Sequence, residues 1–249
     1  MDILRRLEHK YFLTEPVAAA VEAAIQAYCS PDPLGADGYT IHSLYYDTVD
    51  LAFFRANKLK QQWRHKPRVR IYDTNATGPV YLEVKSKEGD IVSKVRQRIE
   101  PARWPSVLDA PGPLHDQGFC ELVRRTGAVP TLHVRYHRTA WVSDVDVYGR
   151  VTFDRRLRCA LAHGDPDLRV HEQDLTFVDD PRVMFAPGSF VVLELKCEQL
   201  IPRWMVNLVR RFELVQLGFS KYGAGIERMG LDPEPLDAGP EGQRSRYSR

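Results

Sequence analysis

Residues 66–100 place charge where a soluble sheet normally buries apolar side chains. Three strand-like runs, KPRVRIY, VYLEVKSK and IVSKVRQRIE, are separated by turns that contain Gly78 and Gly89. Side chains of a strand alternate between two faces, so this stretch predicts an antiparallel meander with two unlike faces. One face carries eight cationic side chains against a single carboxylate, Glu83. The eight are Lys66, Arg68, Arg70, Lys85, Lys87, Lys94, Arg96 and Arg98.

That face permits two interpretations. It could simply be solvated, but solvated faces usually mix signs, and like charges on neighbouring strands destabilise a sheet. We therefore expect an anionic ligand to offset the repulsion. The net charge of the 249-residue chain is only +2, so the pattern indicates a local anion site rather than a generally basic surface.

The rest of the composition predicts a cytoplasmic protein. The four cysteines are scattered without metal-type spacing, which is typical of free thiols in a reducing compartment. No run approaches ~20 apolar residues, so we expect neither a signal peptide nor a transmembrane segment. The GxxxxGK[ST] loop of P-loop ATPases is absent from the sequence.

The alternating pattern recurs along the chain. Further strands are expected at residues 4–13, 39–47, 131–142, 150–158 and 189–198, with a weaker one at 168–177. Helices are expected at residues 17–28, 47–57, 116–125, 202–217 and 220–229. We assign residues 1–230 to one domain and residues 231–249, rich in Pro, Gly and charge, to a flexible tail. About eight two-faced strands fit either a sheet with helices on its apolar side or a barrel with a polar lumen and outer helices.

Nine short motifs occur in an order that resembles the VTC domain, the polyphosphate polymerase domain of the vacuolar transporter chaperone complex. They are EHKY (8–11), SLYYDT (43–48), RVRIY (68–72), LEVKSK (82–87), KVRQR (94–98), YHRTAW (136–141), RVTFD (150–154), LELK (193–196) and FSKY (219–222). The resemblance implies an α+β fold of the CYTH-like triphosphate tunnel metalloenzymes, an antiparallel β-barrel tunnel with helices packed outside.

The resemblance also implies site residues. Carried over as phosphate binders are Lys10, Arg68, Arg70, Lys85, Lys94, Arg138, Arg150 and Lys221. Position on the charged strand face alone adds four second-rank candidates for phosphate binding, Lys87, Arg96, Arg98 and Lys196. Glu194 matches the family's metal-binding glutamate, which would hold Mn²⁺ or Mg²⁺. Glu8 is a further metal candidate, and for Glu8 and Glu83 an ion pair with neighbouring lysines is the alternative.

Two positions bear on the implied site and activity. Hydrolytic and cyclase-like relatives open with Glu-x-Glu-x-Lys, whereas Arg6, Glu8 and Lys10 hold that register here, which favours binding of a long anion over triphosphate hydrolysis. Strict alternation places Arg138 with Val134 and Tyr136, opposite Arg135. Either a bulge turns Arg138 inward or Arg135 lines the tunnel, and the RTAW match favours Arg138.

The implied activity is transfer of the γ-phosphate of ATP to inorganic polyphosphate or pyrophosphate. The alternatives are a hydrolase of tripolyphosphate or nucleoside triphosphates and a non-catalytic polyphosphate-binding sensor. We expect no nucleic-acid partner, because few aromatic side chains are placed for base stacking. Docking to a membrane protein is compatible with the sequence, which does not determine the oligomeric state.

Overall fold

One antiparallel sheet dominates the computed structural model, which describes residues 7–33, 37–73, 76–89, 91–109, 118–178, 190–198 and 200–232. Its main strands are β1 (Leu7–Leu13), β3 (Tyr39–Asp47), β4 (Trp63–Ile71), β5 (Val80–Glu88), β6 (Ile91–Ile99), β7 (Val129–Ser143), β8 (Gly149–Leu161) and β10 (Val191–Cys197). They pair in the order β1-β10-β8-β7-β3-β4-β5-β6. The short strands β2 (Cys29–Pro31) and β9 (Thr176–Phe177) pair with β7 and β8.

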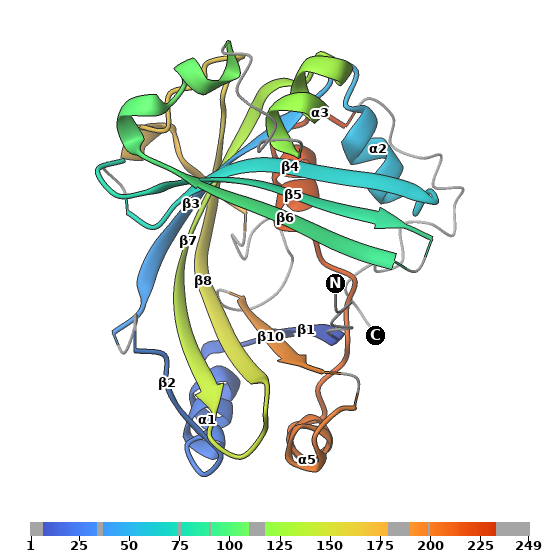
Figure 1. The fold of residues 1–249 in the computed structure, drawn as a ribbon. Helices are drawn as coiled ribbons and strands as arrows, with labels where there is room; N and C mark the ends of the chain where they lie inside the picture. The colour runs from blue at the N-terminus through green and yellow to red at the C-terminus, as the bar shows by residue number, and fades with distance from the viewer. Residues whose placement is uncertain are drawn as a thin grey trace.

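The sheet curls so that β4, β5 and β6 face β1 and β10 (Figure 1). Lys85 Nζ on β5 comes within 3.9 Å of Glu8 Oε2 on β1. Within the described ranges no ladder joins β6 to β1, so the sheet is a curled half-barrel. The predicted α+β antiparallel architecture is confirmed, and helices pack on the convex face of the sheet.

Apolar side chains of alternate residues cover the convex face and attract the helices. Helices α1 (Glu15–Ile25) and α5 (Arg203–Arg211) pack on β1, β8 and β10 through Val21, Ile25 and Met205. Helix α3 (Phe119–Thr126) covers β4 and β5, and Gly127, with a φ of 64°, ends it. All four cysteines are free, as predicted, and the structure buries them. No helix of the described residues is long and apolar enough to cross a membrane.

Helix α6 (Lys221–Arg228) instead packs against the concave face, where Tyr222 and Ile226 contact Tyr45, Val134 and Tyr136. Ser220 caps its N-terminus by accepting a hydrogen bond from the Gly223 N–H at 3.2 Å. The concave face is therefore apolar beside α6 and charged beyond it.

Several predicted boundaries were wrong for local reasons. Helix α2 (Ala52–Lys58) begins five residues after Asp47, because the Asp47 carboxylate accepts the N–H groups of Phe53 and Phe54 at 2.8 Å each. The helix predicted to reach residue 217 ends at Arg211, and the Leu217 N–H donates to the Lys10 carbonyl of β1. The strand predicted at 168–177 is limited to β9. The predicted tail at 231–249 lies outside the described residues except for Leu231 and Asp232.

Candidate anion-binding site

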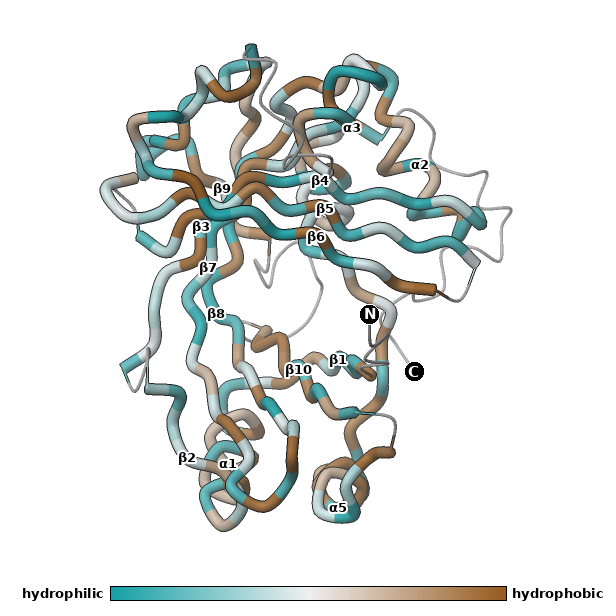
Figure 2. The backbone as a smooth tube through the Cα atoms, in the orientation of Figure 1, coloured by the Kyte–Doolittle hydropathy of each residue, from teal (hydrophilic) through white to brown (hydrophobic). Residues whose placement is uncertain are grey.

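The concave face carries the charged side chains of alternate strand residues, and we call the space that it encloses the lumen. Figure 2 shows hydrophilic and hydrophobic residues alternating along β4, β5 and β6. The structure brings most predicted site residues together around three lumen carboxylates, Glu83, Asp154 and Glu194. Their ion-pair partners are Lys10, Arg68, Arg70, Lys94, Arg96, Arg138, Lys196 and Lys221.

Glu194, on β10, contacts cations from four elements. Its Oε1 lies 3.0 Å from Lys221 Nζ and 3.8 Å from Lys10 Nζ. Its Oε2 lies 2.8 Å from Lys196 Nζ and 3.3 Å from Arg138 Nη2. Burial opposes ionisation of Glu194, but the four cations, Lys221 first, outweigh it and hold the pKa well below its usual range. Glu194 is therefore an anion that neutralises part of the cation cluster.

Asp154, on β8, is a second carboxylate of the same wall that sequence analysis did not select. Arg138 donates two hydrogen bonds to it, at 2.6 and 2.7 Å, and Lys221 Nζ lies 2.6 Å from Oδ2. The bidentate bond fixes the plane of the Arg138 guanidinium. Asp154 shares its parity with Arg150 in the RVTFD motif, and that parity was the signal that could have identified it.

The structure places Arg138, not Arg135, in the lumen. Val134 and Tyr136 also face inward because α6 packs on them, and the Arg138 guanidinium lies 5.4 Å from the centroid of the Tyr136 ring. Strict alternation along β7 therefore accounts for the position of Arg138 in the lumen. The β7–β8 register nevertheless shifts between Arg135 and His137. Arg135 pairs with Glu172 and donates to the Val170 carbonyl at 3.2 Å.

Glu83, on β5, organises the opposite wall. Arg68 on β4 donates through Nε at 2.7 Å, and Arg70 Nη1 lies 3.7 Å away. On β6, Lys94 Nζ and Arg96 Nε lie 2.9 and 3.4 Å from Oε1. Burial opposes ionisation here too, but Arg68, Arg70 and Lys94 hold the pKa of Glu83 below its usual range.

Tyr45 and Ser43 on β3 support the Glu83 wall and were not predicted as site residues. The Tyr45 hydroxyl accepts a hydrogen bond from Arg68 Nη1 at 3.0 Å, and the Ser43 hydroxyl accepts one from Arg70 Nε at 3.3 Å. Both hydroxyls come from the SLYYDT motif, whose alternate residues face the lumen. These bonds hold both arginines in place independently of Glu83.

Glu8 lies where β1 approaches β5. It lies 3.1 Å from Lys10, 3.9 Å from Lys85 and 4.0 Å from Lys196. Burial would raise the pKa of Glu8, but Lys10 and Lys196 lower it to about 2. The ion-pair alternative for Glu8 and Glu83 therefore describes the geometry of both residues.

The carboxylates present fit a metal only together with a phosphate. Among the described residues no three His, Cys, Asp or Glu side chains form a group that could hold a metal ion. Hard divalent ions take oxygen ligands, and Mg²⁺ is usually bound by one or two carboxylates plus substrate phosphates. Glu194 could supply one such carboxylate ligand at the centre of the cation cluster.

Three other predicted binders, Arg150, Lys87 and Arg98, form no ion pair with the three lumen carboxylates among the described residues. Arg150 Nη2 pairs with Asp32 at 2.6 Å and donates to the Tyr39 hydroxyl at 3.3 Å. Arg96 also stacks 3.9 Å above the centroid of the Tyr81 ring. Lys87 lines a cavity described below. The side chain of Arg98 is 62% exposed, and its Nη2 lies 3.8 Å from Glu100 Oε1.

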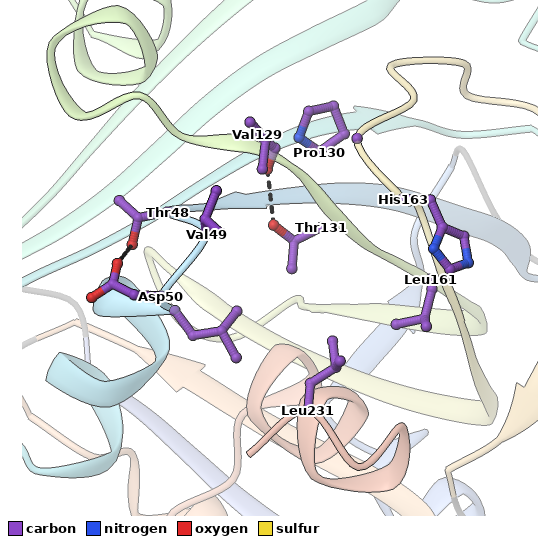
Figure 3. Close-up of a pocket in the computed structure, with 11 residues that line it drawn as sticks. Thr48, Val49, Asp50, Val129, Pro130, Thr131, Leu161, His163 and Leu231 are labelled. Carbon is purple, nitrogen blue, oxygen red and sulfur yellow. Dashed lines mark hydrogen bonds between the residues drawn. The ribbon is translucent and has the colours of Figure 1, made fainter. Parts of the chain in front are cut away.

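A pocket of about 330 Å³ beside α2 is unrelated to these cations. Figure 3 shows Thr48, Asp50, Val129, His163 and Leu231 around it. Neither lysine nor arginine occurs among its lining residues. A larger cavity of about 1180 Å³ lies between α2, the Trp63 end of β4 and α6, and is lined by Arg64, Lys66 and Lys87 among others. We call it the outer cavity.

Comparisons with known proteins agree with the fold. The family model of the VTC domain matches residues 5–230. A putative adenylate cyclase from Bacillus halodurans is similar in structure, with a TM-score of 0.52 and 11% identity over 90% of this chain and 97% of that chain. A Mimivirus capping enzyme triphosphatase aligns over 83% of this chain and 88% of its own at 7% identity, but its TM-score of 0.32 supports no argument. No curated protein matches this sequence.

Proposed function

Because this chain belongs to the VTC domain family, we propose that it is an enzyme of the triphosphate-tunnel type that extends inorganic polyphosphate with the γ-phosphate of ATP. The observation that carries the proposal is the lumen itself, where cations from five strands and α6 surround three buried carboxylates. Phosphoryl transfer depends mainly on positioning and charge neutralisation, and fixed cations supply both. We also propose a cytoplasmic location.

The reaction moves one phosphoryl group between two oxygens. The bond between the γ-phosphorus and the β–γ bridging oxygen of ATP breaks, and a bond to a terminal oxygen of the phosphate chain forms, so that ADP leaves. Arg68, Arg70 and Arg138 present planar forks that can each bind two phosphate oxygens, while Lys10, Lys94 and Lys221 act as mobile charges. Mn²⁺ or Mg²⁺ held by Glu194 would supply further neutralisation of the phosphate oxygens.

The proposal is tested by incubating the purified protein with ATP, Mn²⁺ and a pyrophosphate or short polyphosphate primer. Phosphorus NMR and gel electrophoresis should show internal phosphate signals together with ADP. Release of orthophosphate alone would indicate a hydrolase instead. Unchanged ATP with retained polyphosphate binding would indicate a non-catalytic sensor. Glu194→Gln is the matched variant, which should lose turnover and keep anion affinity because the cations remain.

A further inference from the structure

Strand β4 carries a row of cations that extends beyond the lumen. Arg70, Arg68, Lys66 and Arg64 are alternate residues on one face, opposite Tyr81, Glu83, Lys85 and Lys87 on β5. Alternate residues of an antiparallel strand are about 6.8 Å apart, so the row covers about 20 Å. Its inner end lies beside Glu83, and its outer end, with Arg64 and Lys87, lines the outer cavity.

The two halves of this row differ in their partners. Arg68 and Arg70 pair with Glu83. Among the described residues, no carboxylate forms an ion pair with Arg64, Lys66 or Lys87, and the Nε of Arg64 is buried without a hydrogen-bond partner. Like charges this close repel one another. The outer half of the row therefore lacks the anion that the inner half has in Glu83.

Ser220 places a hydroxyl group beside these cations. Its Oγ accepts hydrogen bonds from Lys66 Nζ at 3.1 Å and from the Gly223 N–H at 3.2 Å, so its own hydrogen is free to donate. The next residue, Lys221, points to Glu194 in the lumen. The start of α6 thus contributes one donor to the lumen and one to the outer cavity.

Lys58 shows that not every cation of this cavity is available. It lines the same space but pairs with Glu227 at 3.7 Å and with Asp232. Its charge is already neutralised, so we do not include it in the site.

We propose that Arg64, Lys66, Lys87 and Ser220 form a second anion-binding subsite, which holds phosphate units of a linear inorganic polyphosphate after they leave the lumen. The proposal rests on the proposed function and adds a direction, because it assigns the outer cavity as the end through which the chain passes. Only a chain long enough to occupy lumen and cavity together gains the additional contacts.

The test compares binding of tripolyphosphate and of a long polyphosphate by calorimetry, without ATP or metal. In the wild-type protein the long chain should bind more tightly per molecule. In Arg64→Gln/Lys87→Gln the ratio of the two affinities should fall by about tenfold, because two unpaired cations are lost. Arg203→Gln/Arg210→Gln on α5 removes the same charge outside the lumen and should leave the ratio unchanged.

Equal loss of affinity for both ligands in the cavity variant, or an equal change of the ratio in the α5 control, would overturn the subsite. If the double variant does not fold, as judged by circular dichroism, the single Lys87→Gln variant should still lower the ratio, and no change would overturn the proposal. A wild-type protein that binds long chains but does not consume ATP would refute the polymerase and leave the subsite supported. The two failures are therefore distinguishable.

Discussion

Glu194 and Glu83 each contact four cations, but they collect them from different distances along the chain. The partners of Glu83 all lie on β4 and β6, the two neighbours of its own strand. The partners of Glu194 come from β1, β7, β10 and α6. One carboxylate stabilises a local meander, whereas the other connects the two ends of the domain. Although each carboxylate contacts four cations, we therefore expect removal of Glu194 and removal of Glu83 to change the stability of the fold by different amounts.

Burial reinforces this difference. The side chains of Lys221 and Arg138 beside Glu194 are 8% and 10% exposed. Those of Lys94 and Arg96 beside Glu83 are 44% and 38% exposed. Lys94 and Arg96 can turn to water when Glu83 is lost, but Lys221 and Arg138 cannot do so when Glu194 is lost.

The largest effect is expected for Glu194→Gln. Removing one partner of a buried ion network typically costs 3–5 kcal/mol, and since Asp154 still binds Arg138 and Lys221 we expect a loss of about 3 kcal/mol in the free energy of unfolding. Chemical denaturation followed by circular dichroism measures this loss. A change below about 1 kcal/mol would show that Asp154 alone neutralises the cluster.

Glu83→Gln should cost less, about 1–2 kcal/mol. Arg68 and Arg70 keep their bonds to Tyr45 and Ser43, and the β6 cations become hydrated. The same denaturation experiment compares the two variants directly. If Glu83→Gln is the more destabilising, the local network rather than the long-range one holds the fold together.

Acidification should expose the contribution of Glu83. Its pKa is lowered in the folded state, so the stability it contributes is present above the unfolded-state pKa of about 4.3 and is lost as the pH falls below that value. Between about pH 5 and pH 3 the wild-type protein should lose on the order of 1 kcal/mol more than Glu83→Gln. Parallel pH profiles would show that Glu83 gains no net stabilisation from its cations.

The smallest effect concerns Lys66 on the outer half of the β4 row. Burial, with repulsion from Lys10, Lys85, Arg68 and Arg64, lowers its pKa to about 7. An arriving polyanion favours the charged form, so at about pH 8 binding should take up a fraction of a proton at this lysine. Calorimetry in two buffers of different ionisation enthalpy measures that uptake. It should decrease in Lys66→Gln but not in the exposed control Arg210→Gln, and identical uptake in all three proteins would contradict the assignment.

The sequence was sufficient for features that depend on strand parity. Alternation identified the lumen faces of β1, β4, β5, β6 and β10, and ordered motifs identified the family. The sequence alone could not show which cations share a carboxylate, because strand order and register are long-range properties. Asp154 was missed for this reason, since only the pairing of β8 with β7 and β10 brings it to Arg138 and Glu194. Helix α5 was predicted too long because its apolar pattern does not reveal that residues 216–217 bond to β1.

The even spacing of the β4 row also has a consequence for motion. A polymer of identical units that advances along evenly spaced donors exchanges each contact for an equivalent one, so its energy changes little from step to step. Glu83 offers the two inner donors of the row, Arg68 and Arg70, an alternative partner whenever a phosphate unit departs. In a polymerase of the proposed kind, such exchange would let a tightly held product slide forward without being released.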